Sequence, residues 1–154
     1  MYPYLLVAHS VFRWLVVVFI VYTICRCCVG LMQHRPFSKT DDAFRHWTAT
    51  VAHIQLMIGM VLYAKSPLVQ YFWSGSRTAP APLNISFFAV IHILLMFAAI
   101  VLLTAGSALA KRKLEDREKF RTILIWYAIV LVVIVIAIPW PFSPLSARPY
   151  LRMF

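Results

Sequence analysis

Acidic residues are scarce in this chain of 154 residues, which holds 5 Asp and Glu against 15 Lys and Arg. None of the acidic residues falls inside the four long apolar runs of the sequence. Their absence there excludes the membrane-embedded carboxylates on which proton and cation relays usually depend. It also excludes the paired carboxylates of a di-metal or hydrolytic site. Charged residues of both signs make up only 13% of the chain, whereas soluble domains carry about 25%. This composition favours lipid over water as the solvent.

Cysteine is also rare, and its three residues, Cys25, Cys27 and Cys28, lie within one short segment. An odd, clustered set of cysteines argues against a disulfide framework. The first ten residues lack the cationic start that a secretory signal needs. The first apolar run is therefore expected to remain in the mature protein.

Apolar residues are abundant instead, at 62% of the chain. Four continuous runs approach or exceed the ~20 residues that span a bilayer. Because the runs do not alternate with polar residues, helices rather than barrel strands are expected to satisfy the backbone in lipid. The sequence thus predicts an all-α membrane protein, a four-transmembrane-helix bundle that forms one domain over residues 1–154. The helices are predicted at about 4–28, 41–65, 85–110 and 116–139, and Ser38 with Asp41 resembles a capping box at the start of the second helix.

Lysine and arginine residues between the runs predict the orientation of the bundle. Ten lie in two connections on one side: Arg26, Arg35, Lys39, Arg45, Lys111, Arg112, Lys113, Arg117, Lys119 and Arg121. Four lie on the other side: Lys65, Arg77, Arg148 and Arg152. Because basic connections stay in the cytoplasm, the N and C termini are both expected on the non-cytoplasmic side. The same distribution identifies the positive charges as topology signals, so the bilayer is the expected partner and nucleic acid is not.

Histidines and one arginine are the ionisable residues that fall inside the runs. Such residues are costly in hydrocarbon and are functional hypotheses by default. His9, His53 and His92 lie on three different predicted helices, and Arg13 lies one turn beyond His9. Neutral imidazole is the commonest metal ligand, and helices of a four-helix bundle can converge on one cofactor. Haem iron takes axial histidines of this kind, so the pattern favours one haem b.

Depth in the bilayer ranks the possible pairs of ligands. With a rise of about 1.5 Å per residue, His9 lies roughly 8 Å and His92 roughly 11 Å below the same membrane surface. His53 lies roughly 20 Å below that surface in a ~30 Å core. His9 with His92 is therefore the best-matched pair, and His53 with His92 is the second choice. Mixed ligation by Met57 or Met96 together with a histidine is a further possibility.

Arg13 needs an anionic partner if it is buried, and a haem propionate would supply one. The alternative is that its head reaches the interface or binds backbone carbonyls. Gln55 or Ser10 is expected to orient a ligand imidazole, as outer hydrogen-bond partners of metal-bound histidines commonly do. The alternative for the histidines is a helix-to-helix hydrogen bond, which contributes about 1 kcal/mol.

Three segments carry a resemblance to a known family: His9-Ser10-x-x-Arg13-Trp14, His46-x-Thr48-Ala49-Thr50-x-Ala52-His53-Ile54-Gln55 and Ile138-Pro139-Trp140-Pro141-Phe142-Ser143-Pro144. They resemble short multi-pass proteins of the bacterial inner membrane that are labelled cytochrome b or cytochrome b561-like. The resemblance implies haem b held by transmembrane histidines, with His9, His53 and His92 as candidate ligands and quinone or a redox partner nearby. The chain lacks the two well-separated histidines on one helix that larger di-haem cytochromes b have, which puts a two-haem relay in doubt.

Three functions are compatible with these patterns. The first is a b-type haem protein that carries electrons between quinol and a redox partner. The second is a non-enzymatic accessory subunit of a larger respiratory or other membrane complex. The third is a carrier of Cu(I) or another metal that uses thioether and imidazole ligands, namely His53, Met57, Met60, His92 and Met96.

Overall fold

Long helices make up most of the chain. The computed structural model describes residues 2–74 and 82–141, and none of these residues forms a strand. The four long helices are α1 (Tyr2–Met32), α2 (Lys39–Lys65), α5 (His92–Arg112) and α6 (Asp116–Ala137). A short helix α4 (Leu83–Ser86) and a π-helical turn (Phe87–Ile91) run continuously into α5. These elements give four segments long and apolar enough to cross a membrane. The chain is therefore an all-α, multi-pass membrane protein, as the sequence predicts.

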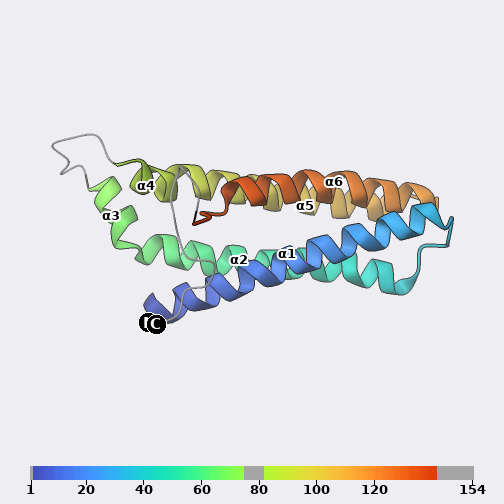
Figure 1. Cartoon of the computed structure of the whole chain (residues 1–154), viewed down its shortest axis with the longest axis horizontal. Coiled ribbons are helices and arrows are strands. Elements are labelled where there is room, and N and C mark those ends of the chain that lie inside the picture. Colours follow the sequence, from blue (N-terminus) through green and yellow to red (C-terminus); the bar gives the residue numbers. More distant parts are fainter. Residues whose placement is uncertain (1, 75–81, 142–154) are drawn as a thin grey trace.

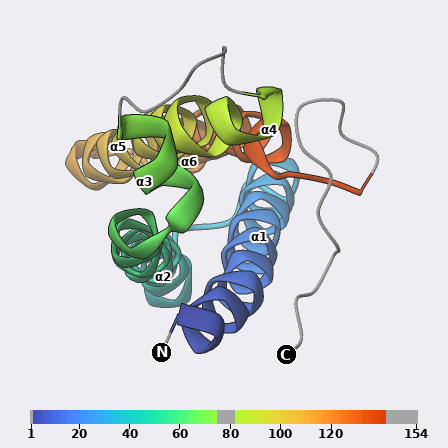
Figure 2. The same cartoon turned by 90° about the vertical axis from the view of Figure 1, so that its left-hand side faces the viewer.

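The four long helices form a bundle in which each packs against two neighbours (Figure 1). α1 contacts α2 and α6, and α5 also contacts α2 and α6, so α1 and α5 lie on a diagonal (Figure 2). The connections from α1 to α2 and from α5 to α6 lie at the same end, which we call the basic end. The opposite end, where α1 begins and α5 is entered, is called the histidine end. Fully buried side chains fill the axis between them, among them Ile20, Leu103, Ile123, Tyr127 and Val130.

The predicted helix bounds lie within four residues of the observed ones when α4, the π-helical turn and α5 are taken as one continuous segment, Leu83–Arg112. The connection after α2, expected to lack a spanning segment, holds the short helix α3 (Pro67–Trp73). Pro67 stands in its first turn, where a missing backbone N–H costs nothing. The placement of both chain termini on the non-cytoplasmic side stays a prediction. The predicted topology residues Arg77, Arg148 and Arg152 lie outside the described residues, as do residues 142–144 of the proline-rich segment.

A buried carboxylate joins α1 to α2 at the basic end. Asp41 is only 4% exposed, and its Oδ1 accepts a hydrogen bond of 2.8 Å from Arg26 Nε. Arg35 binds it bidentately, with Nη1 2.6 Å from Oδ2 and Nη2 2.9 Å from Oδ1. These bonds raise the pKa of Arg35 above its ordinary value. Ser38 and Asp41 also exchange side-chain and backbone hydrogen bonds, which confirms the predicted capping box and explains why α2 begins here.

Replacing this carboxylate is expected to loosen the basic end. The Asp41→Asn variant leaves two guanidinium groups facing a neutral amide, so we expect the free energy of unfolding to fall by about 3 kcal/mol. Denaturation of the full chain in mixed detergent micelles, followed by circular dichroism, measures the loss. Asp116→Asn is the matched control, since Asp116 pairs with Lys119 at 3.0 Å in a more exposed position, where water screens the pair, and its loss should be clearly smaller. An equal loss of unfolding free energy in the Asp41 and Asp116 variants would show that the Asp41 carboxylate does not hold the basic end together.

Candidate functional site

His9 and His92 come together at the histidine end, although they belong to diagonal helices. Their ring centres lie 6.4 Å apart, and the ring planes meet at 71°. Both side chains are partly buried. They are also the two histidines that the sequence places at the most similar depth, so counting the rise along straight helices predicted their proximity.

A π-helical turn directs the His92 ring. The backbone N–H of His92 donates to the carbonyl of Phe87, five residues earlier, so the turn holds one residue more than an α-helical turn. The hydroxyl of Tyr63 on α2 donates to the Ala89 carbonyl within this turn at 2.8 Å. The rings of Phe87 and Phe88 lie 5.8 Å and 6.1 Å from the imidazole. Such turns often occur at functional sites because they re-aim the side chains that follow.

The end of α6 supplies the hydrogen-bond partner of His92. In a regular helix the Ala137 carbonyl would accept from the N–H of residue 141, but this residue is Pro141 and has none. His92 Nδ1 lies 2.9 Å from the Ala137 carbonyl oxygen and takes the place of the missing N–H. Because a carbonyl only accepts, Nδ1 carries the proton. Nε2 then bears the lone pair and makes no hydrogen bond within residues 2–74 and 82–141, which is the state of a metal-ligating imidazole.

His9 is held more loosely than His92. Its carbonyl accepts from Gln55 Nε2 at 2.9 Å, and Gly59, one turn further along α2, faces its ring. A Cβ at position 59 would lie 3.2 Å from His9 Cε1, so glycine permits the close approach. His9 Nδ1 and Gln55 Oε1 are both buried without a hydrogen-bond partner. Orphaned buried polar atoms are rare in proteins, and lipid cannot satisfy them. Their presence indicates that a bound group or water completes this site.

Arg13 places a positive charge beside the histidine pair. It follows His9 by one turn of α1. Its Nη2 lies 3.5 Å from the buried Ser10 hydroxyl, and its guanidinium carbon lies 5.6 Å from the centre of the Trp14 ring. The histidine end therefore combines two facing imidazoles with a cation one helical turn deeper in the bundle.

His53 is not part of this pair. Its side chain is exposed on the outside of the bundle, where Nδ1 contacts the Ala49 carbonyl at 2.7 Å and Nε2 contacts Thr104 Oγ1 at 3.3 Å. Thr104 lies three helical turns beyond His92 on α5, a separation of roughly 18 Å. Met57, at 64% exposure, is on the outer surface as well. The described residues contain no group of three or more His, Cys, Asp or Glu side chains that could hold a metal ion.

Comparison with protein-family models, with curated proteins and with solved structures finds no match for the chain.

Two contributors to the site were not identified from the sequence. Gly59 is a small residue in an apolar helix, and nothing in the sequence around it shows that its neighbour is an imidazole. The second contributor, the Ala137 carbonyl, is a backbone group, but the sequence does contain a feature that points to it. A proline four residues after a helical residue withholds that residue's hydrogen-bond donor, so Pro141 marks a carbonyl that needs another partner.

The Tyr63 hydroxyl is expected to stabilise the π-helical turn. It donates to the Ala89 carbonyl and accepts from Trp73 Nε1 at 3.0 Å, so Tyr63→Phe should lower the free energy of unfolding by about 1–2 kcal/mol. Hydrogen exchange should also rise at residues 87–92. The control is Tyr71→Phe, which removes an exposed hydroxyl that makes no hydrogen bond within residues 2–74 and 82–141 and keeps the carbonyl that accepts from Ser74. Unchanged exchange in the Tyr63 variant would show that the hydroxyl does not hold the turn.

Proposed function

We propose that this chain is a b-type haem protein of the bacterial inner membrane that carries electrons between quinol and a redox partner. The observation that supports it is the facing pair of His9 and His92 on diagonal helices. His92 Nε2 and both ring nitrogens of His9 are without a hydrogen-bond partner in the described part of the chain, so His9 Nε2 stays available if Nδ1 carries the proton. Two such nitrogens in an apolar, carboxylate-free interior are the donor set that haem iron takes.

The separation of the two rings fits a shared metal. At metal–nitrogen distances of about 2.0 Å, two imidazoles that shared one metal would have ring centres no more than about 6 Å apart. The observed separation is 6.4 Å. Neither ring is committed to a carboxylate, and the orphaned Nδ1 of His9 leaves that ring able to adjust. The donor set therefore fits a bis-histidine haem.

The residues around the pair would hold such a group and exclude water. His92 is fixed by the Ala137 carbonyl and His9 is contacted by α2 at Gly59, so the two ligands are positioned by three helices and the end of α6. Arg13 would pair with a propionate, and Gln55 Oε1 is available as an acceptor for His9 Nδ1–H. A bound haem b supplies a one-electron iron couple whose potential depends on its ligands and burial.

A spectrum and two histidine variants test this proposal. Full-length protein produced with ample haem should show a b-type reduced-minus-oxidised spectrum with one haem per chain. His9→Ala and His92→Ala should each abolish it. His53→Ala is the matched control, a histidine of the same bundle that faces outward, and it should retain the haem. A colourless wild-type protein would overturn the proposal, and loss in the His53 variant with retention in the His9 variant would move the ligand to α2.

The charge of Arg13 is expected to tune the bound group. Removing a cation near iron disfavours the reduced, less positive state, so Arg13→Gln should lower the midpoint potential and weaken haem retention. Potentiometric titration of the haem absorption measures the change. Lys65→Gln removes the same charge from the exposed end of α2 and should leave the potential close to that of wild type. Equal shifts in both variants would show only a general effect of net charge.

A second candidate function is supported by His53 and Thr104. This polar pair faces outward from a membrane-spanning surface, where lipid offers no hydrogen bonds. Such a pair suits contact with another membrane subunit, as expected of an accessory component of a larger complex. The two candidates differ in outcome, because an accessory subunit would purify without haem and together with its partner. A Cu(I) site is less favoured, since Met57 and Met60 are exposed.

A further inference from the structure

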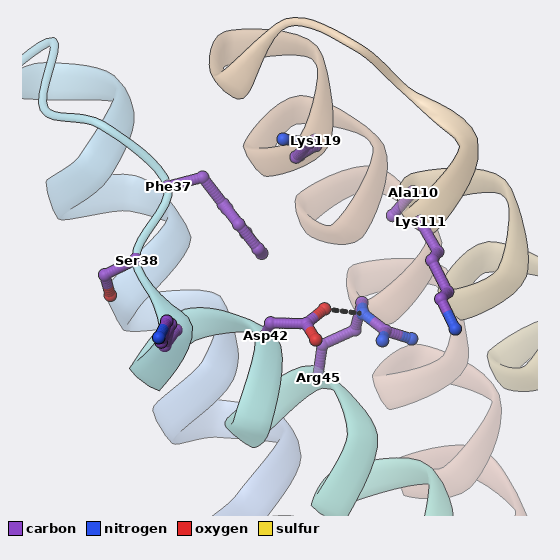
Figure 3. A pocket seen from close by; sticks show the side chains of 8 residues that line it. Phe37, Ser38, Asp42, Arg45, Ala110, Lys111 and Lys119 are labelled. Atoms are coloured by element: carbon purple, nitrogen blue, oxygen red, sulfur yellow. Dashed lines mark hydrogen bonds and ion pairs between the residues drawn. The ribbon is translucent and has the colours of Figure 1, made fainter.

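A second polar site lies at the basic end, away from the histidine pair. A cleft of about 270 Å³ opens between the start of α2, the end of α5 and the start of α6 (Figure 3). Its charged wall consists of four cations and one carboxylate: Lys39, Arg45, Lys111, Lys119 and Asp42. The ring of Phe37 adds an apolar surface to it.

Arg45 has a buried side chain that hydrogen bonds hold in place in the wall of this cleft. It is only 7% exposed, and its Nε donates to Asp42 Oδ1 at 2.8 Å, the pair drawn in Figure 3. Nη1 donates to the hydroxyl and the carbonyl of Ser107, and the Tyr127 hydroxyl donates to the Arg45 carbonyl at 2.9 Å. Asp42 on α2 and Ser107 on α5 therefore hold the guanidinium in place, and Tyr127 on α6 holds the Arg45 backbone. Its Nη2 makes no hydrogen bond in the described part of the chain, so one donor remains for a ligand.

The lysines around Arg45 are incompletely neutralised. Lys119 pairs with Asp116 at 3.0 Å and lies 5.5 Å from the centre of the Phe37 ring. No ion pair is found for Lys39 or Lys111 among the described residues. The cleft therefore presents two uncommitted ammonium groups and a fixed guanidinium donor, opposed only by the Asp42 carboxylate that Arg45 already binds.

We propose that this cleft binds a phosphate group. Phosphate oxygens can accept hydrogen bonds from ammonium and guanidinium groups together. A cationic ligand would be repelled by these groups, and an apolar ligand would remove water from them without replacing its hydrogen bonds. The cleft lies where membrane-spanning helices end, at the level of lipid headgroups, and basic pockets between helices at this level suit anionic headgroups. Its volume is below the roughly 300–1,000 Å³ of sites for drug-sized ligands, which suits a headgroup phosphate or free phosphate.

Thermal unfolding of the full-length protein in a neutral detergent tests the site. Intrinsic tryptophan fluorescence follows the melting temperature during titration with phosphatidylglycerol, phosphatidylcholine or inorganic phosphate, and the shifts give dissociation constants. Lys39→Ala combined with Lys111→Ala removes the two uncommitted lysines and should weaken binding about thirty-fold. Arg117→Ala combined with Arg121→Ala is the matched control, because it removes the same charge from exposed positions outside the cleft and should change binding by less than about threefold.

Each outcome decides the proposal. Tighter binding of phosphatidylglycerol than of the other two ligands, lost in the lysine variant, supports a lipid headgroup as the source of the phosphate. Binding of inorganic phosphate as tightly as the lipid, again lost in the lysine variant, supports a free phosphate. Equal weakening in the lysine and arginine variants would overturn the site in favour of general surface attraction. Absence of stabilisation by any of the three ligands would overturn it as well.

Discussion

Lipid supplies no hydrogen bonds, so a backbone group that loses its partner inside this bundle has to find another within the protein. The two prolines that follow α6 withhold the donors that the carbonyls of Val135 and Ala137 would otherwise use. Trp140 Nε1 binds the first carbonyl at 2.8 Å and His92 Nδ1 binds the second at 2.9 Å. The end of one helix thereby fixes the ring and the tautomer of a histidine on its neighbour. The geometry of the histidine pair follows from this requirement.

The two ends of the bundle differ in how far their polar groups are satisfied. At the basic end, both oxygens of Asp41 accept from Arg35, and the capping box satisfies the start of α2. At the histidine end, His9 Nδ1 and Gln55 Oε1 are buried without partners. Among the described residues, these buried polar groups of the basic end thus have hydrogen-bond partners, whereas two at the histidine end have none, although both sets lie between α1 and α2. This contrast favours a bound group at the histidine end over a merely structural role for its imidazoles.

The helices and the histidine pair were accessible from the sequence because lipid restricts the chain to few choices. Apolar runs of spanning length become helices, and a constant rise then places His9 and His92 at one depth. The capping box is likewise local in sequence. The π-helical turn was not accessible, since i to i+5 bonding has no compositional signature. The outward direction of His53 was not accessible either, because α2 is apolar on most sides. The basic cleft required knowing that the start of α2, with Lys39, and the end of α5, with Lys111, line one cleft.

The position of the histidine pair constrains any electron transfer by this chain. From His9 to the end of α1 at Met32 the helix runs roughly 35 Å. The interior along this length is filled by side chains such as Ile20, Leu103 and Val130, and the described residues contain no second pair of facing imidazoles. A redox group bound near the histidine end would therefore have no relay toward the basic end within the described bundle. In the proposed function, the electron donor and acceptor both have to reach the histidine end, and transfer across the membrane would require a partner subunit.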